Sequence, residues 1–332
     1  MRLTKRKETI LMKKMEVTEV FELIKSAKSI ALFSHINPDC DTICSSLALR
    51  SFLMKLGKKV SSFCDGDLKN DMASLSGASD LNADTLASGY DLTISIDCAT
   101  EDRLGKYRNA FRKGKHTLSI DHHLQDRPYA EYNLIDPRSG ATAELIYLII
   151  EAGNIGLMDR EIASLLYTAL VTDTGNFGFS NVGERTLYIA SRLISYGIPN
   201  AEISFRHFRE IPLSTFRLKM RVFSKIQLFE DNKIGIVTFT KEDFEATGTT
   251  IMNSSNLVSD VANISGLEIA ISITEVHPNS YKVSIRTQHD VNANEIAMRF
   301  GGGGHKNAAG FMINGFYGNI LDDILKACRD CL

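Results

Sequence analysis

Short apolar runs alternate with segments of helical periodicity through the first part of the chain. The apolar runs predict buried strands because each is short and bounded by polar or glycine-containing turns. These runs cover residues 30–33, 60–64, 92–96 and 117–120. Helices are predicted after them, at residues 43–56, 141–151, 160–172 and 184–195. Such alternation is typical of a parallel sheet with crossover helices, so we expect an α/β domain.

The pattern changes after residue 200. Residues 200–225 are helical and charged and contain no predicted strand. Beyond them, three segments alternate like the strands of a mixed sheet: 234–239, 267–274 and 281–287. We therefore expect a parallel-sheet α/β domain, a helical connector and a smaller mixed-sheet α/β domain, over residues 20–205, 206–225 and 226–332 respectively.

Aspartate and histidine residues follow the carboxyl ends of three predicted strands. They are His35, Asp39, Asp41, Asp97, Asp121, His122 and His123. A further aspartate, Asp173, ends an apolar helix. Ligands of open parallel sheets bind beyond the carboxyl ends of the strands, so these side chains are expected to converge. Clustered carboxylates raise one another's pKa unless a cation is present, which predicts a metal site.

The mixture of carboxylate oxygens and imidazole nitrogens suits Mn²⁺, Mg²⁺ or Zn²⁺, and the excess of carboxylates favours Mn²⁺ or Mg²⁺. The donors exceed what one metal with open positions requires. They fit two ions about 3.5–4 Å apart that share a carboxylate and a hydroxide. Any one of these residues alone would more often be a turn former or a helix cap. The metal site is predicted by their joint occurrence.

The ordered motifs resemble the DHH phosphoesterases, a family named for the triplet found here at Asp121-His122-His123. A His-x-x-Pro-Asp-x-Asp element precedes the triplet, and a Thr-Asp-Thr-Gly turn follows it. Residues 301–305 and 308–311 are similar to the glycine-rich signature of the DHH-associated C-terminal domain. Arg286 stands where that domain carries its substrate-binding arginine. The resemblance covers roughly residues 25–330.

The resemblance implies a role for each of these residues. One metal would be held by His35, Asp39 and Asp97. The other would be held by Asp41, Asp97, His122 and Asp173, so that Asp97 bridges. The catalytic residues would be His123, which faces the substrate, and Asp121, which orients an imidazole. The substrate-binding residues would be Arg286, Gly302, Gly303, Gly304 and His305. Two divalent ions are implied as cofactors, with Mn²⁺ preferred and Mg²⁺ as the alternative.

The glycine run at residues 301–304 allows two interpretations. It could be a flexible loop. Because residues 306–309 are helix-like, it could also let backbone N–H groups approach a phosphate at a helix N-terminus. Together with the planar guanidinium of Arg286, the second interpretation predicts an anion site that faces the metal site across a cleft.

The sequence departs from the family pattern at three positions. Cys40 and Cys44 stand where glycine or alanine is typical, and Asn176 stands where arginine is expected. We interpret the cysteines as small packing residues, because Cys40 lies between two ligand aspartates and adjacent side chains rarely point the same way. The change at Asn176 puts one phosphate contact in doubt.

The amino-acid composition argues against several classes of protein. Lys and Arg number 38 and Asp and Glu 40, which gives a net charge of −2, so the chain has no basic field for long duplex nucleic acid. No apolar run approaches the roughly 20 residues of a membrane span. The 6 cysteines are too few for a disulfide scaffold, so a cytoplasmic location is expected.

A chain of this length without added domains resembles the oligoribonucleases of the family that also act on 3′-phosphoadenosine 5′-phosphate. The resemblance implies hydrolysis of short RNA oligonucleotides to mononucleotides and conversion of that nucleoside bisphosphate to AMP. The sequence is compatible with a homodimer.

Four alternative functions are compatible with parts of the same pattern. A phosphodiesterase for cyclic or linear dinucleotides (c-di-AMP or pApA) shares the layout. A non-catalytic nucleotide-binding protein is disfavoured because every expected ligand is present. A RecJ-type exonuclease would need an added binding domain. A family II pyrophosphatase would need a basic Ser-Arg-Lys-Lys type element that this sequence lacks.

Overall fold

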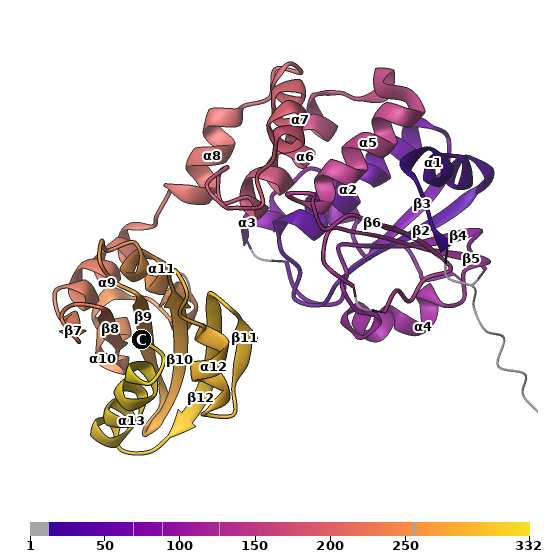
Figure 1. Ribbon diagram of the computed structural model, residues 1–332. Coiled ribbons are helices and arrows are strands. Elements are labelled where there is room, and N and C mark those ends of the chain that lie inside the picture. The colour runs from indigo at the N-terminus through magenta and orange to yellow at the C-terminus, as the bar shows by residue number, and fades with distance from the viewer. Residues whose placement is uncertain (1–12, 69, 88, 126, 255–256) are drawn as a thin grey trace, which may run out of the picture. The chain divides into compact units, whose positions relative to one another are not determined.

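The computed structural model shows two compact units, each built around its own six-stranded sheet (Figure 1). The first unit ends at Glu210 and the second begins at Ile211. The structure describes residues 13–68, 70–87, 89–125, 127–254 and 257–332. Within these ranges, no helix combines the length and the apolar character that a bilayer crossing requires.

All strands of the first sheet are parallel, in the order β1-β6-β5-β4-β2-β3. They are β1 (Lys13–Lys14), β2 (Ser29–Ser34), β3 (Lys59–Phe63), β4 (Leu92–Ile96), β5 (His116–Asp121) and β6 (Tyr132–Ile135). The four apolar runs correspond to β2, β3, β4 and β5, which confirms the parallel-sheet prediction. Strand β6 was missed because its four residues include the buried polar side chain of Asn133.

Both faces of this sheet are buried, which explains why its central strands are apolar at nearly every position. Ile30 and Leu32 of β2 belong to a core shared with helices α1, α2, α5 and α6. Ala31 and Phe33 point to the opposite face, where Phe111 packs against them. The helices and 3-10 turns are α1 (Val17–Ser26), α2 (Cys40–Lys55), α3 (Asn70–Ala73), η1 (Ala78–Asp80), η2 (Glu101–Tyr107), α4 (Arg108–Phe111), α5 (Thr142–Asn154), η3 (Ile155–Leu157), α6 (Arg160–Asp173), α7 (Glu184–Ile194) and α8 (Asn200–Phe208).

The second sheet is mixed, as predicted, with the order β11-β12-β10-β9-β8-β7. Only β8 and β9 run parallel among its described pairs. Its strands are β7 (Gln227–Phe229), β8 (Ile234–Phe239), β9 (Ile269–His277), β10 (Ser280–Thr287), β11 (Gly303–His305) and β12 (Ala308–Asn314). The accompanying helices and turn are α9 (Leu213–Phe223), α10 (Lys241–Thr247), η4 (Ile251–Ser254), α11 (Leu257–Ala262), α12 (Ala293–Met298) and α13 (Tyr317–Arg329).

The segment expected as a connector, residues 206–225, is divided between the two units. Helix α8 ends in the first unit, whereas α9 is part of the second. Val222 of α9 is fully buried in a core of the second unit. The buried carboxylate of Asp243 accepts hydrogen bonds from Arg221 Nε at 2.6 Å and from Lys225 Nζ at 2.9 Å. Arg221 thereby joins α9 to α10, and Val222 packs in a core that also includes Val237 and Phe239 of β8.

The prediction of a helix over residues 306–309 is wrong, because β11 and β12 form a hairpin there. Ala308 and Gly310 of β12 lie opposite Arg286 and Ser284 of β10, so this stretch is extended. Alanine has a high intrinsic helix propensity, but pairing with a neighbouring strand overrides that preference. The expected helix N-terminus for binding a phosphate is therefore absent from this stretch.

Two of the glycines are required by the hairpin itself. A Cβ atom at Gly302 would lie 2.3 Å from the Gly310 carbonyl oxygen, and one at Gly304 would lie 2.4 Å from the Ala308 carbonyl oxygen. Gly303 differs, because the nearest atom to its Cβ position is Asn294 Oδ1 at 3.7 Å.

We expect Gly302→Ala to destabilise the second unit by about 1–3 kcal/mol, since the added methyl group forces the hairpin strands apart. Gly303→Ala is the matched control and should stay close to the wild type. Urea unfolding of the full chain measures both variants. Equal midpoints for the two would show that the hairpin does not depend on close backbone approach at Gly302.

Candidate active site

The order of the first sheet brings the predicted site residues together. Strands β2, β4 and β5 are neighbours, and His35, Asp97 and His122 directly follow their carboxyl ends. Helix α2 begins directly after the loop that follows β2. Its N-cap residue Asp39 accepts the Thr42 N–H at 3.1 Å.

Three groups of side chains in the described part of the chain could hold a metal ion, with the ligand atoms of each group within 4.8 Å of one another. The groups are His35, Asp39 and Asp97; Asp41, His122 and Asp173; and Asp97, His122 and His123. All six ligands expected from the sequence are among them, and none of the groups includes a cysteine. Cys40 and Cys44 are instead buried in the core of the first unit.

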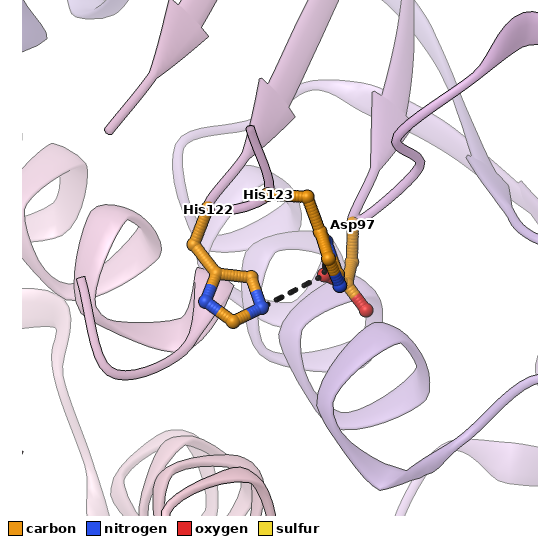
Figure 2. Close-up of side chains that lie close together, drawn as sticks. All are labelled: Asp97, His122 and His123. Carbon is orange, nitrogen blue, oxygen red and sulfur yellow. Dashed lines mark ion pairs between the residues drawn. The ribbon is translucent and has the colours of Figure 1, made fainter. Parts of the chain in front are cut away.

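The carboxylate of Asp97 faces two histidines with different oxygens. Its Oδ2 lies 3.7 Å from His35 Nε2, and its Oδ1 lies 3.6 Å from His122 Nε2. Figure 2 shows the His122 and His123 rings converging on this carboxylate. Such separations suit donors that lie about 2.0–2.1 Å from a shared ion. The Asp97 carboxylate could therefore be shared by two ions.

The backbone of Asp97 is in the left-handed region, with φ of 56°. This conformation is costly for a residue other than glycine and is found most often at functional sites. The Asp97 N–H donates to the Ile120 carbonyl oxygen at 2.9 Å, so Asp97 stays attached to β5.

Backbone carbonyl groups fix the orientation of both ligand imidazoles. His35 Nδ1 lies 2.8 Å from the Ile36 carbonyl oxygen, and His122 Nδ1 lies 3.1 Å from the Ser139 carbonyl oxygen. A carbonyl oxygen only accepts, so His122 Nδ1 donates and its Nε2 is left to bind an ion.

Burial and mutual repulsion perturb the aspartates. Desolvation, followed by the charges of Asp97 and Asp173, holds the pKa of Asp41 well above its usual range. Desolvation and the charges of Asp97 and Asp39 raise the pKa of Asp173 to about 6, despite the opposing effect of His122. Desolvation also acts on Asp39, but hydrogen bonds from His35 and Thr42 outweigh it and lower the pKa of Asp39 to about 2.

His123 and Asp121 form a hydrogen-bonded pair. Asp121 Oδ1 accepts His123 Nδ1–H at 2.8 Å, and its Oδ2 accepts the Gln125 amide at 2.6 Å. Hydrogen bonds to Asp121 and then to Asp97 raise the pKa of His123 to about 11. The imidazole that Asp121 orients is therefore that of His123, whose side chain is 40 % exposed.

The sequence reasoning missed several residues that contact the ligands. Thr142 donates its N–H to Asp41 Oδ2 at 2.7 Å and its hydroxyl to Asp97 Oδ1 at 2.9 Å. Arg103 Nη2 lies 2.9 Å from His35 Nδ1. The available signal for Thr142 was its place at the start of a predicted helix, where backbone N–H groups lack helical partners.

The expected substrate-binding residues lie in the second unit. Arg286, on β10, is opposite Ala308 of β12, and Ala308 is opposite His305 of β11. Burial lowers the pKa of Arg286, and its Nη1 donates to the Ile285 carbonyl oxygen at 2.9 Å. Gly303 and His305 lie exposed on the edge strand.

Asn176 lies in a left-handed turn directly after Asp173, with φ of 56°. Its Oδ1 accepts the Ser204 hydroxyl of α8 at 3.0 Å. The Asn176 side chain therefore ties the turn to α8.

Comparison with known proteins assigns both units. Residues 29–170 match the DHH family N-terminal domain, and residues 236–332 match the DHHA1 domain. The chain belongs to the DHH family of phosphoesterases. As a DHH phosphoesterase it is a metal-dependent hydrolase.

Three relatives of this DHH protein show how far the similarity extends. It is 30 % identical to the bifunctional oligoribonuclease and PAP phosphatase NrnA of Thermus thermophilus, over 94 % of this chain and 93 % of that protein. It is 29 % identical to the Bacillus subtilis protein of the same name, over 94 % and 99 %. An exopolyphosphatase-related protein from Bacteroides fragilis shares the fold, with a TM-score of 0.86, 24 % identity and 95 % of each chain covered.

The raised pKa of Asp173 predicts that the free energy of unfolding depends on pH when metal ions have been removed with EDTA. The folded chain binds this proton more tightly than the unfolded chain, so the contribution of Asp173 to stability is lost as pH rises from about 4 through 6. Asp173→Asn removes the titration and should flatten this slope. Thermal denaturation in EDTA between pH 4.5 and 7 measures it. An unchanged slope in the variant would contradict the pKa assignment.

Proposed function

We propose that this chain hydrolyses short oligoribonucleotides to mononucleotides and removes the 3′-phosphate of 3′-phosphoadenosine 5′-phosphate. The observation that carries the proposal is the Asp97 carboxylate, whose Oδ2 faces His35 and whose Oδ1 faces His122. The two relatives named oligoribonuclease and PAP phosphatase, aligned over nearly the full chain, support the substrate class.

The donor set fits two divalent ions, because it consists of carboxylate oxygens and imidazole nitrogens and lacks thiolates. We assign His35, Asp39 and Asp97 to one ion. We assign Asp41, Asp97, His122 and Asp173 to the other. Mn²⁺ is preferred over Mg²⁺ because imidazole contributes to each group. When bound, such ions lower the pKa of a water molecule and neutralise charge on a phosphoryl group.

The protein groups supply orientation and a proton. Asp121 holds His123 protonated through the 2.8 Å hydrogen bond, so His123 can donate to a phosphate oxygen or to the leaving oxygen. The Arg286 guanidinium offers two parallel donors for a terminal phosphate. Recognition of one end of the substrate selects short oligonucleotides and nucleoside bisphosphates, in keeping with the net charge of −2.

We expect Asp97→Asn to abolish hydrolysis of every substrate, because an amide cannot bridge two cations. Asp102→Asn is the matched control: its side chain is 81 % exposed and forms an ion pair with Arg108. The assay offers a 5′-labelled RNA trimer, 3′-phosphoadenosine 5′-phosphate and c-di-AMP in parallel with Mn²⁺, with and without EDTA. Mononucleotides and AMP, lost in EDTA, are the expected products. Preferential opening of c-di-AMP, or activity in EDTA, would contradict the proposal.

We expect Arg286→Ala to raise KM about 10-fold or more and to change kcat little, since loss of a charge-assisted contact weakens binding by about 1.5–3 kcal/mol. Arg299→Ala, which removes an exposed partner of Asp330 in the same unit, is the control. Steady-state kinetics with the RNA trimer separates the two parameters. If both stayed at wild-type values, Arg286 would not bind the phosphate.

A further inference from the structure

One short segment contacts ligands of both proposed ions. This segment, residues 139–143, is called here the support segment. Its Ser139 carbonyl accepts from His122, and its Thr142 donates to both Asp41 and Asp97. The Ala143 N–H donates to Asp41 Oδ1 at 3.2 Å. The segment thereby sets the position of three ligand side chains.

The support segment also reaches the fourth ligand of the second group. Asn181 Nδ2 donates to the Gly140 carbonyl oxygen at 2.9 Å and to the Asp173 carbonyl oxygen at 3.2 Å. A Cβ atom at Gly140 would meet Thr174 Cγ2 at 3.1 Å, so the segment packs tightly against the turn that carries Asp173. A shift of the segment would therefore move the ligands of the second ion, among them Asp97, which the two ions share.

Two side chains outside the segment hold it in place. Glu144, fully buried in the first turn of α5, accepts the Gly140 N–H at 3.0 Å and the Thr186 hydroxyl at 2.6 Å. Arg185 of α7 donates to Glu144 Oε2 at 2.9 Å and to Ser139 Oγ at 2.6 Å. Both carboxylate oxygens of Glu144 are thus occupied by protein donors, so Glu144 is not available as a ligand.

The chemistry of the pair agrees with a positioning role. A buried ion pair adds little stability compared with apolar side chains of the same volume. A guanidinium, however, can donate in several fixed directions at once. Arg185 uses this to join Glu144, Ser139 and Asp136, the last at 3.0 Å. Apolar packing would fill the same space without fixing the Ser139 side chain and the Gly140 backbone.

We propose that Glu144 and Arg185 are positioning residues for the metal ligands: they act through the support segment to hold His122, Asp41 and Asp97 in binding geometry. The inference rests on the proposed two-metal function. Neither residue touches a ligand side chain of the proposed ions, and their effect on the reaction passes through the affinity for the ions. Loss of such supporting contacts typically weakens metal binding about 10- to 100-fold.

The test uses a double variant, Glu144→Gln with Arg185→Met, which removes both charges together and leaves neither one buried alone. The full chain is stripped with EDTA, dialysed and titrated with Mn²⁺ by calorimetry. We expect affinity to fall about 10- to 100-fold. Activity on the RNA trimer should return towards the wild-type kcat when Mn²⁺ is raised in proportion, because the catalytic side chains are intact.

Arg138→Ala is the matched control. Arg138 also pairs with Asp136, but its side chain is 87 % exposed. Its Mn²⁺ affinity should equal that of the wild type. Should the double variant fail to fold, Arg185→Lys keeps the charge beside Glu144, and its loss of the guanidinium fork should still lower Mn²⁺ affinity.

The outcomes separate this inference from the function on which it rests. Unchanged Mn²⁺ affinity in the folded variants would overturn the positioning role, as would lost activity that saturating Mn²⁺ does not restore. Reduced affinity with recovered kcat would support it. A wild-type chain that binds no Mn²⁺ would instead overturn the two-metal function, and the inference with it.

Discussion

The dominant constraint on the first unit is the electrostatic repulsion between the aspartates that it brings together at its site. Asp41 and Asp97 have almost no exposed side-chain surface, and Asp39 and Asp173 lie beside them. Like charges in a dry environment destabilise one another, so they persist only where donors and cations compensate. The chain supplies donors from the first turns of α2 and α5, whose N-termini favour negative charge. Divalent ions bound by these aspartates would supply the remaining compensation.

A parallel sheet is well suited to building such a centre. Neighbouring strands end at the same edge, so residues from positions 35 to 123 meet without a long loop. Both faces of the sheet are covered, which keeps the strand ends rigid and partly dry. The strained backbone of Asp97 is tolerated because its N–H bonds β5 and its carboxylate is held by Thr142. Packing of the sheet therefore stabilises a geometry that the isolated turn would not adopt.

Much of this could be predicted from the sequence, because buried parallel strands are continuous apolar runs and the ligands directly follow them. The hairpin at β11 and β12 could not, because its alanine and glycine residues carry no strand preference and pair only in the presence of β10. Strand β6 was hidden by Asn133. The support segment was missed for another reason: Thr142 and Ser139 act mainly through backbone groups, whose direction no side-chain pattern reveals. Glu144 and Arg185 are distant in sequence from each residue they help to position.

The acidic centre also constrains how an anionic substrate can bind. A phosphate brought beside this aspartate cluster meets negative charge that is compensated on the protein only by protonated His123 and the guanidinium of Arg103, among the side chains that the structure describes. Ions held by the aspartates, as proposed, would reverse the sign of the local field. Substrate and cation affinities are therefore coupled, and by reciprocity the substrate tightens the ions by the same factor. Residues that fix the ligands, such as Thr142, influence substrate binding through this coupling even though they contact only the protein.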